Sequence, residues 1–380
     1  MKILKQFLFV SLLSIMVSSC SKEPLNAECD IITAVLPGGV QNRDAIIDNN
    51  KVTFIVKNGT SLSALAPEFT LTPGATIDPP SGTVRDFNSP QTYVTTSEDG
   101  DWHKTYTVEV TYADMINLEY NFENVRTEVI NNSAFDVFFE IDAQGRETLT
   151  WASGNGGFAL TGIAYGKDDP SLFPTYQINE GRSGKAVAMT TRRTGVFGAM
   201  ANKPIASGSL FIGQFVLSDA MAHPLEATQF GTPFVNIPRT LKGYYKYTPG
   251  ETYYEFDKSA SGKLRPIDDK VDKFNIYAVF FETTDDMQHL DGNDTMSPNN
   301  PNIVATAEIA DAERVATTQW RKFEIPFNYR TDNIDLNKLK EGRYSITIVF
   351  ASSIDGDFFS GAPGSTLIVD EVELSCLEEY

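Results

Sequence analysis

The residues best suited to chemistry are aromatic rings interleaved with cations near the middle of the chain. The run 241–247 reads Leu-Lys-Gly-Tyr-Tyr-Lys-Tyr. A flat ring can cover the C–H face of a sugar, while planar polar side chains bind its hydroxyl groups. In a strand, Tyr245 and Tyr247 share one face, and Tyr244 and Lys246 share the other. We expect one of these pairs in the core and the other exposed.

Three residues outside this run offer the same chemistry. Trp151 has the largest ring, and the guanidinium groups of Arg192 and Arg239 could form forked bonds to hydroxyls or to a uronate. Each ring, taken singly, also fits a place in a core. As a set, these side chains predict one carbohydrate-binding patch, composed of Trp151, Arg192, Arg239, Tyr244, Tyr245 and Tyr247.

Catalytic residues are harder to assign. Glycoside hydrolysis needs two carboxyl groups about 5–9.5 Å apart across a cleft. Neither a Gly-x-Ser-x-Gly elbow nor a His-Glu-x-x-His motif occurs. The sequence therefore favours glycan binding without cleavage. A glycoside hydrolase or lyase is the alternative, and a structural or adhesin subunit is the third hypothesis. Carboxylates are available outside any motif at Asp219, Glu226, Asp268, Asp269 and Asp286.

Several loops have partial ligand-binding patterns. Residues 284–295 are acidic and contain Asp291-Gly-Asn293, but the terminal Glu of an EF-hand calcium loop is absent, so a long solvated loop is favoured. Asp355-Gly-Asp357 is a weaker copy of the same pattern. Residues 153–157 include three glycines, which would cradle a phosphate only before a helix. We expect a turn there.

Length and charge limit the class of protein. The chain has 380 residues, enough for two domains, and its formal net charge is −19. Nucleic-acid binding needs a basic surface, and anionic lipid attracts basic segments, so this charge argues against both partners. It is compatible with a protein that binds neutral sugars.

The strand pattern predicts an all-β protein. Residues 105–112 alternate Tyr and Val with Thr and Glu, as in a strand with one wet face. Short strands and turn signals predict an antiparallel sandwich at residues 29–113. About ten strands at residues 117–377 predict a larger jelly-roll sandwich. Only residues 332–340 suggest a helix, with Asp332 or Asn333 as its cap.

The N-terminus has the features of a targeting segment. Residues 1–19 have a basic start and a short apolar run, which predicts a secretory signal peptide. Val17-Ser-Ser-Cys20 resembles a bacterial lipobox, which implies lipidation at Cys20 and a linker at residues 20–28. We expect an outer-membrane lipoprotein at the cell surface or, alternatively, one that faces the periplasm. The sequence leaves open whether Cys29 and Cys376 form a disulfide.

The C-terminal region resembles a family of Bacteroidetes lipoproteins called the "putative carbohydrate metabolism domain". The resemblance rests on Phe215-Val-Leu-Ser218, Phe230-Gly-Thr-Pro-Phe234, Pro238-Arg239 and residues 243–250. It implies a carbohydrate as partner and leaves the chemistry open.

Two further resemblances concern the N-terminal sandwich and the last strand of the C-terminal sandwich. Leu62-Ser-Ala-Leu-Ala-Pro67 and Tyr106-Thr-Val-Glu-Val110 resemble the immunoglobulin-like modules of Bacteroidetes glycan-uptake proteins, which act as spacers. The last strand resembles that of carbohydrate-binding jelly rolls, some of which hold a structural calcium. The matching carboxylates are Glu123 and Asp370, and solvated strand-end carboxylates are the alternative.

Overall fold

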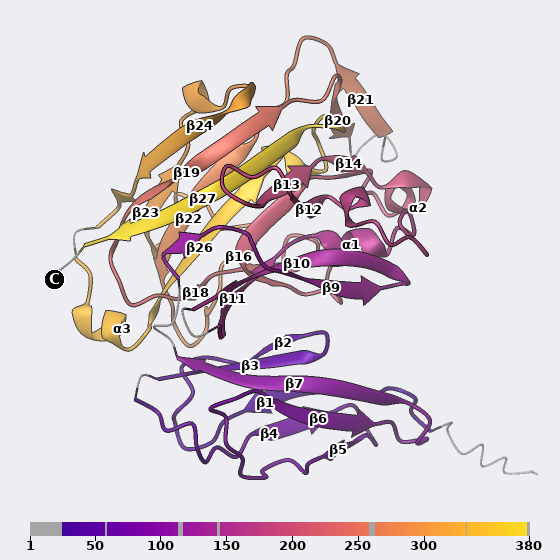
Figure 1. Ribbon diagram of the computed structural model, residues 1–380, viewed down its shortest axis with the longest axis vertical. Helices are drawn as coiled ribbons and strands as arrows, with labels where there is room; N and C mark the ends of the chain where they lie inside the picture. The colour runs from indigo at the N-terminus through magenta and orange to yellow at the C-terminus, as the bar shows by residue number, and fades with distance from the viewer. Residues whose placement is uncertain are drawn as a thin grey trace, which may run out of the picture.

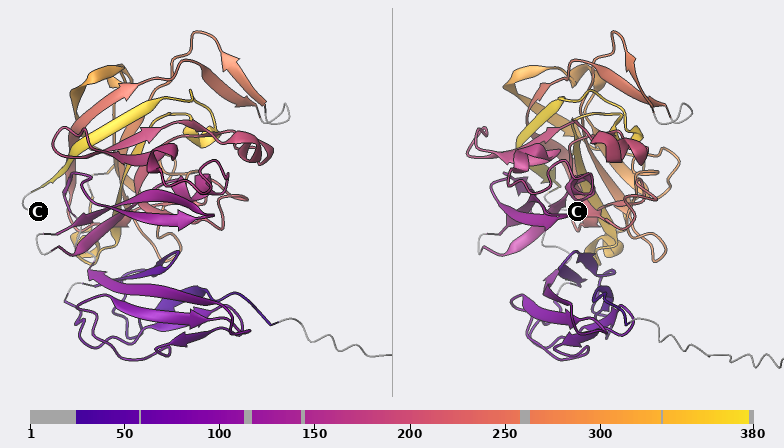
Figure 2. Two further views of the ribbon diagram at one scale, coloured as in Figure 1. Left: turned by 45° about the vertical axis from the view of Figure 1, so that its right-hand side comes forward. Right: turned by 90° about the vertical axis from the view of Figure 1, so that its right-hand side faces the viewer.

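The protein consists of two β-sandwiches that stay separate in every view (Figures 1 and 2). The structure is a computed structural model that describes residues 25–57, 59–112, 117–142, 145–257, 263–331 and 333–377. The expected signal segment 1–19 and the expected lipidation site Cys20 lie outside the described residues. No helix in the described ranges is long and apolar enough to cross a membrane.

The N-terminal sandwich has two sheets. One is the pair β1 (Ile31–Val35) and β4 (Glu68–Leu71). The other has the order β2-β3-β7-β6-β5. In it β3 and β7 run parallel, so the expectation of an antiparallel sandwich is wrong for this pair. Its core includes Ile31, Phe54, Tyr93 and Val108, so apolar faces of both sheets meet. The strands of the second sheet are β2 (Ile46–Asp48), β3 (Lys51–Val56), β7 (His103–Tyr112), β6 (Gln91–Thr96) and β5 (Thr76–Asp78).

The C-terminal sandwich has a large sheet in the order β25-β23-β22-β26-β16-β11-β10-β9, with β17 beside β16 and β18 beside β26. The strands are β25 (Asn328–Tyr329), β23 (Ile303–Glu308), β22 (Asn275–Glu282), β26 (Tyr344–Ala351), β16 (Ser209–Phe215), β11 (Glu147–Ala152), β10 (Ser133–Ile141), β9 (Val125–Ile130), β17 (Thr228–Phe230) and β18 (Thr232–Pro233).

The smaller sheet packs against the large one in the order β12-β13-β27-β19-β24, with β8 beside β27. Two short pairs, β14–β15 and β20–β21, lie outside both sheets. These strands are β12 (Thr175–Ile178), β13 (Ala186–Thr190), β27 (Thr366–Cys376), β19 (Pro238–Thr248), β24 (Thr317–Pro326), β8 (Glu119–Tyr120), β14 (Arg192–Arg193), β15 (Ile205–Ala206), β20 (Tyr253–Asp257) and β21 (Lys263–Ile267).

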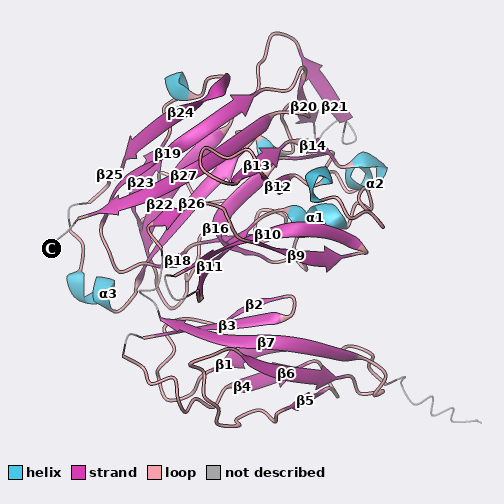
Figure 3. Cartoon of the chain, in the orientation of Figure 1, coloured by secondary structure: helices cyan, strands magenta, loops and turns pink. Residues whose placement is uncertain are grey.

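Helices are few, short and at the edges (Figure 3). They are α1 (Asn155–Ala159), α2 (Gly195–Met200), α3 (Leu336–Lys340) and the 3-10 turns η1 (Pro170–Leu172), η2 (Asp311–Glu313) and η3 (Gly356–Phe358).

The all-β prediction with two sandwiches is confirmed, and three local expectations need correction. The short helix α3 begins after Asp335, whose carboxylate accepts the N–H groups of Asn337 and Lys338 at 2.9 and 3.2 Å, so neither expected residue is its cap. The glycine-rich loop at residues 153–157 runs into α1, where a simple turn was expected. The sequence pattern did not reveal α2. Helices of five or six residues leave almost no periodicity to detect.

The core of the C-terminal sandwich lies between its two sheets. On β22, Ile276, Ala278 and Phe280 face this core. The alternate residues Tyr277 and Val279 face the other side of the large sheet, because successive side chains of a strand point in opposite directions. Cys29 and Cys376 are both free thiols.

Candidate functional site

Trp151, the largest ring of the predicted carbohydrate patch, belongs to the core. It is only 2% exposed and lies 5.2 to 6.0 Å, between ring centroids, from Tyr120, Phe122 and Phe350. Its indole N–H donates to Oε1 of Glu140 at 3.0 Å. A ring enclosed in this way has no free face for a sugar, so the prediction that Trp151 binds carbohydrate is wrong.

The tyrosines of β19 lie on its two opposite faces, as the alternation of side chains along a strand requires. Tyr245 and Tyr247 are the core pair, each packed on Phe274 at 4.7 and 4.8 Å between ring centroids. Their burial contradicts the prediction that they bind carbohydrate. Tyr244 faces outward and is partly exposed, but the guanidinium of Arg182 lies 3.7 Å from its ring centroid. The outward ring is therefore already covered on one face.

The two predicted arginines lie apart from a common patch. Nε of Arg192 donates to the carbonyl of Phe173 at 3.0 Å, so this side chain holds a nearby loop. Arg239 is exposed near the start of β19, whereas Arg192 lies in the separate strand β14. The six predicted residues thus form no single binding surface, because most of them stabilise the fold.

Glu123 and Asp370, the predicted calcium ligands, hold the same turn. Oδ2 of Asp370 accepts the N–H groups of Arg182 and Ser183 at 2.6 and 3.1 Å. Oε1 of Glu123 accepts the N–H of Lys185 at 2.9 Å.

Calcium usually takes six to eight oxygen ligands, and any ion here would share these oxygens with N–H donors. No group of three or more His, Cys, Asp or Glu side chains suited to a metal occurs among the described residues. Binding of calcium by Glu123 and Asp370 therefore stays a prediction.

A different site emerges on the outer face of the large sheet, at a cavity of about 370 Å³ that we call the sheet pocket. Its floor is a row of residues that the strand register places side by side. Tyr277 of β22 pairs with Glu308 of β23 on one side and with Val349 of β26 on the other. Val349 in turn pairs with Phe211 of β16. Directly opposed side chains on one face of a sheet lie about 5 Å apart, so the row is continuous.

The walls of the sheet pocket come from loops and from the short helices α1 and α2. Phe158, Phe197, Met221 and Phe359 line it, and most of the other lining is apolar. Two of the lining side chains are themselves exposed, Phe197 (49%) and Met221 (44%). Exposed apolar side chains in the wall of a cavity are a feature of binding surfaces.

Glu308 is held rigidly at the pocket. Its Oε1 accepts from Nη2 of Arg314 at 2.7 Å and from Nδ2 of Asn275 at 3.1 Å. The same Nη2 donates to Oδ1 of Asn275 at 2.9 Å, and the side chain of Arg314 is only 7% exposed. This triangle fixes the orientation of the Glu308 carboxylate.

Asp357 and Tyr277 contrast with Glu308. Neither side chain makes a hydrogen bond or ion pair with any residue in the described ranges. Asp357 keeps solvent access at the rim, but protein atoms surround its carboxyl, and this desolvation raises its pKa to about 6. Burial first, then the charges of Asp357 and Glu308, raise the pKa of Tyr277 far above its usual value.

A buried hydrogen-bond network fixes the loop that carries Asp357. Oδ2 of Asp272 accepts from Oγ of Ser353 at 2.6 Å, from the N–H of Ala362 at 2.7 Å and from Oγ of Ser365 at 2.7 Å. Between these anchors, Phe359 has φ of 54°, a conformation that costs a non-glycine residue on the order of 1 kcal/mol. The network offsets this cost and holds η3 over the pocket.

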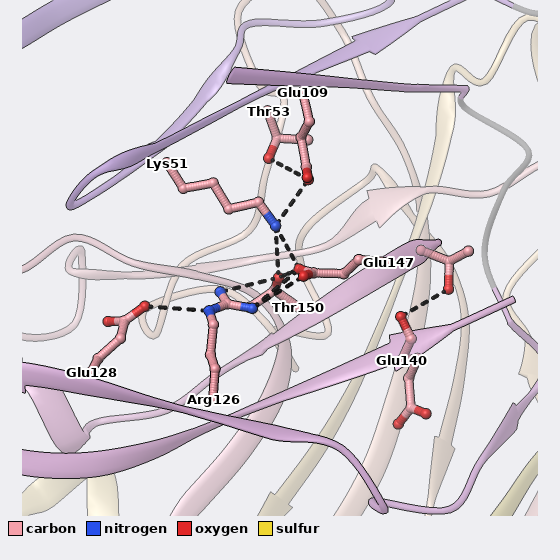
Figure 4. Close-up of polar contacts among 9 residues, drawn as sticks. Lys51, Thr53, Glu109, Arg126, Glu128, Glu140, Glu147 and Thr150 are labelled. Carbon is pink, nitrogen blue, oxygen red and sulfur yellow. Dashed lines mark hydrogen bonds and ion pairs between the residues drawn. The ribbon is translucent and has the colours of Figure 1, made fainter. Parts of the chain in front are cut away.

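A second cavity, of about 790 Å³, lies between the two sandwiches and is crossed by charged side chains (Figure 4). Nζ of Lys51 lies 2.9 Å from Oε1 of Glu109 in its own sandwich and 2.5 Å from Oε1 of Glu147 in the other. Nη1 of Arg126 also contacts Glu147, at 3.2 Å. Because these charges neutralise one another, the cluster serves to join the sandwiches.

The sequence patterns include only a few residues of the sheet pocket, among them Phe215 and Phe230 of the family resemblance. Asp357 was noted as part of a weak calcium-loop pattern, whereas Glu308, Tyr277 and Phe197 were not singled out. Alternation within β22 marks Tyr277 as facing away from Ile276, but nothing in the sequence identifies its strand neighbours. None of the five carboxylates considered for hydrolysis lines this pocket.

Two family models match the chain. One, described as "Putative carbohydrate metabolism domain", matches residues 121–375. The other, described as "SGBP, N-terminal", matches residues 31–110. No curated protein matches the sequence.

Two solved structures are similar over most of their length. A protein from Bacteroides thetaiotaomicron, described as a "putative glycoside hydrolase", is 44% identical with a TM-score of 0.85, and the match covers 94% of this chain and 99% of that one. A protein from Bacteroides vulgatus with the same description is 44% identical with a TM-score of 0.63, and the match covers 70% of this chain and 100% of that one.

Proposed function

Because the chain belongs to the "Putative carbohydrate metabolism domain" family, we propose that it binds a glycan in the sheet pocket. The observation that carries this proposal is a cavity with aromatic walls and a few fixed polar groups. Phe197 and Phe359 offer ring faces, and Asn275 and Glu308 offer planar polar groups. This combination of rings and planar polar groups suits a sugar, as in ligand sites generally.

The N-terminal sandwich is proposed to act as a spacer between this pocket and a lipid anchor at Cys20. Its match to the "SGBP, N-terminal" model supports a role beside a glycan-binding module. The charged cluster between the sandwiches supports a fixed orientation of the spacer relative to the pocket. The proposed location is the outer membrane, at the cell surface.

Glycan retention tests the binding proposal. The full chain would be run in affinity gels that contain amylopectin, xyloglucan, arabinoxylan or galactomannan, with Phe197→Ala as the pocket variant. Truncating an exposed ring at a binding site costs on the order of 2 kcal/mol, so we expect roughly 30-fold weaker retention. Trp102→Ala is the matched control, since Trp102 is 61% exposed on the other sandwich. Equal retention of Phe197→Ala and wild type would move the site elsewhere.

A second candidate function, cleavage of glycosidic bonds, is favoured by one specific observation. Two carboxyl residues in contrasting environments, Glu308 and Asp357, line the same pocket. A structural or adhesin role is the third hypothesis. A folded chain that retained no polysaccharide would favour it.

A further inference from the structure

The cavity between the two sandwiches, which we call the cleft, lies on the same face of the large sheet as the sheet pocket. On β16, Phe211 belongs to the hydrophobic cluster that also contains Tyr277, and Phe215 packs against this cluster. Phe211 lines the sheet pocket, and Phe215 lines both cavities. Ala152 of β11, which pairs with Phe211, lines the cleft. The two cavities are therefore neighbours along one sheet surface.

The segment that contains the start of α1 separates the two cavities. Ser153 and Gly156 line the cleft, whereas Gly154 and Gly157 line the sheet pocket. A Cβ at Gly157 would lie 3.3 Å from Cζ of Phe215, so the glycine lets the backbone pack closely against this ring. All five of these residues are partly exposed. One ligand can therefore lie across them and enter both cavities.

The N-terminal sandwich supplies the opposite wall of the cleft. On β7, Tyr106 and Val108 lie in the core of that sandwich, so the alternate residues Glu109 and Thr111 face the cleft. Asn49, in the turn between β2 and β3, is exposed and also lines the cleft. A hydroxyl, an amide and a carboxylate of the N-terminal sandwich are thus available to a ligand on the large sheet.

The width of the cleft is set by contacts outside the charged cluster of Figure 4. Three consecutive residues of the N-terminal sandwich bind the C-terminal sandwich. Nδ2 of Asn42 donates to the carbonyl of Glu341 at 2.6 Å. Nη2 of Arg43 donates to Oγ of Ser345 at 2.7 Å, and the N–H of Asp44 donates to Oε1 of Gln288 at 3.0 Å. The two walls are therefore held in place before any ligand binds.

The charges in the cleft indicate what kind of ligand it takes. Carboxylates outnumber the lysines in its lining, which contains Asp30, Glu109, Glu128 and Glu147 but only Lys51 and Lys104. Even with Arg126, which contacts Glu147, the acidic groups remain in excess. Like charges repel, so this excess disfavours uronates and phosphates and favours a neutral ligand.

We propose that one neutral polysaccharide chain occupies the sheet pocket and the cleft together and crosses the α1 segment beside Phe215. Cavities of about 300–1,000 Å³ are typical of complete ligand sites, so two adjoining ones suit a ligand longer than either. This inference rests on the proposed binding function and deepens it, because the ligand becomes an extended chain. It also gives the N-terminal sandwich a direct part in binding, in addition to its role as spacer.

The test measures how affinity depends on chain length. Malto-, cello-, xylo- and manno-oligosaccharides of four and eight sugar units would be titrated calorimetrically into the full chain. Once four units fill the sheet pocket, the remaining units bind the cleft as part of the same molecule. The octasaccharide that binds should therefore be at least about 10-fold tighter than its tetrasaccharide.

Two cleft variants should remove this gain without weakening the tetrasaccharide. Thr111→Trp fills the cleft, so the octasaccharide should bind no better than the tetrasaccharide. Asn49→Gly removes the amide but suits the φ of 47° at this position, and it should weaken the octasaccharide about threefold or more. Thr70→Trp, at an exposed position of β4 outside the cleft lining, is the matched control and should behave as wild type. Phe197→Ala should weaken both lengths.

The possible failures separate this inference from the binding proposal. Equal affinity of the two lengths for wild type would overturn the extended site and leave glycan binding in the sheet pocket intact. A length gain that persists in Thr111→Trp and Asn49→Gly would also overturn it, since the chain would then run elsewhere. Tighter binding of oligogalacturonates than of the neutral chains would overturn the choice of ligand. A folded chain that binds no oligosaccharide and is retained on no polysaccharide would overturn both proposals.

Discussion

Lys51 of the N-terminal sandwich lies 2.5 Å from Glu147 of the C-terminal sandwich, in a position where both side chains are at least three-quarters shielded from solvent. Burial alone would raise the pKa of Glu147, but Lys51 and Arg126 outweigh it and hold this pKa below its usual value. The pair therefore stabilises the folded state above the ordinary pKa of a glutamate and loses this contribution as pH falls below it.

We expect a coupling between these two charges in a double-mutant cycle. With Lys51→Met, Glu147→Gln and the double variant, urea unfolding at pH 7 should give a coupling free energy of roughly 1–2 kcal/mol, because the pair is partly desolvated. The exposed pair Lys322–Glu324 is the control, with an expected value below about 0.5 kcal/mol. Equal coupling for the two pairs would show that the interface charges do not join the sandwiches.

Because the carboxyl of Glu140 is buried, we expect the stability of the protein to decline as pH rises toward neutral. Burial raises the pKa of Glu140 to about 7, although the indole of Trp151 opposes this effect. The folded state then holds a proton that the unfolded state has released, so stability falls as pH rises from about 4.5 to 7.

Glu140→Gln keeps an acceptor for Trp151 and removes the buried charge. Its free energy of unfolding should exceed that of wild type by roughly 2–3 kcal/mol at pH 8, and the two should agree near pH 4. Glu119→Gln, at an exposed strand position, is the control. A gain that is the same at both pH values would mean that the charge is not its cause.

Trp151→Ala should unfold the protein more easily without altering a ligand contact. Removing a core aromatic leaves a cavity and costs about 3–5 kcal/mol, measured as the change in urea unfolding. Arg239→Ala, on the exposed end of β19, should change stability by no more than about 0.5 kcal/mol. A stable Trp151→Ala protein with weakened glycan retention would restore the original prediction.

Calcium at Glu123 and Asp370 is tested by thermal melting with and without a chelator. A ligand that binds only the folded state stabilises it by RT ln(1 + [L]/Kd), about 2.7 kcal/mol at a hundredfold excess over Kd. The chelator should lower the melting temperature of wild type, and added calcium should restore it. Asp370→Asn should melt at one temperature under both conditions. Identical wild-type melts would leave these carboxylates as clamps for the turn at residues 181–185.

Lipid anchoring at Cys20 is tested by labelling. Cells that express the full chain should incorporate labelled palmitate into it, and Cys20→Ala should abolish the label, because the thiol is the expected acceptor. Cys29→Ala should keep the label. Labelling that persists in Cys20→Ala would contradict the lipobox.

The residue pattern alone predicted the all-β class and the two different faces of the strand at residues 241–247. Period-two alternation separates Tyr245 and Tyr247 from Tyr244 regardless of the remaining fold. It cannot say which face is buried, since that depends on what packs against the strand. The tertiary structure decided it by placing Phe274 against both core tyrosines.

The sheet pocket depended entirely on the tertiary structure. Sheet register sets Tyr277 beside Glu308, about 30 residues later in the chain, and beside Val349, about 70 residues later. Local propensities carry no information on such long-range pairings, because many registers satisfy the same alternation until one buries the best core. The sequence therefore specified strands and their two faces, while the register of the large sheet and the position of the loop with η3 brought Glu308, Tyr277 and Asp357 to one pocket.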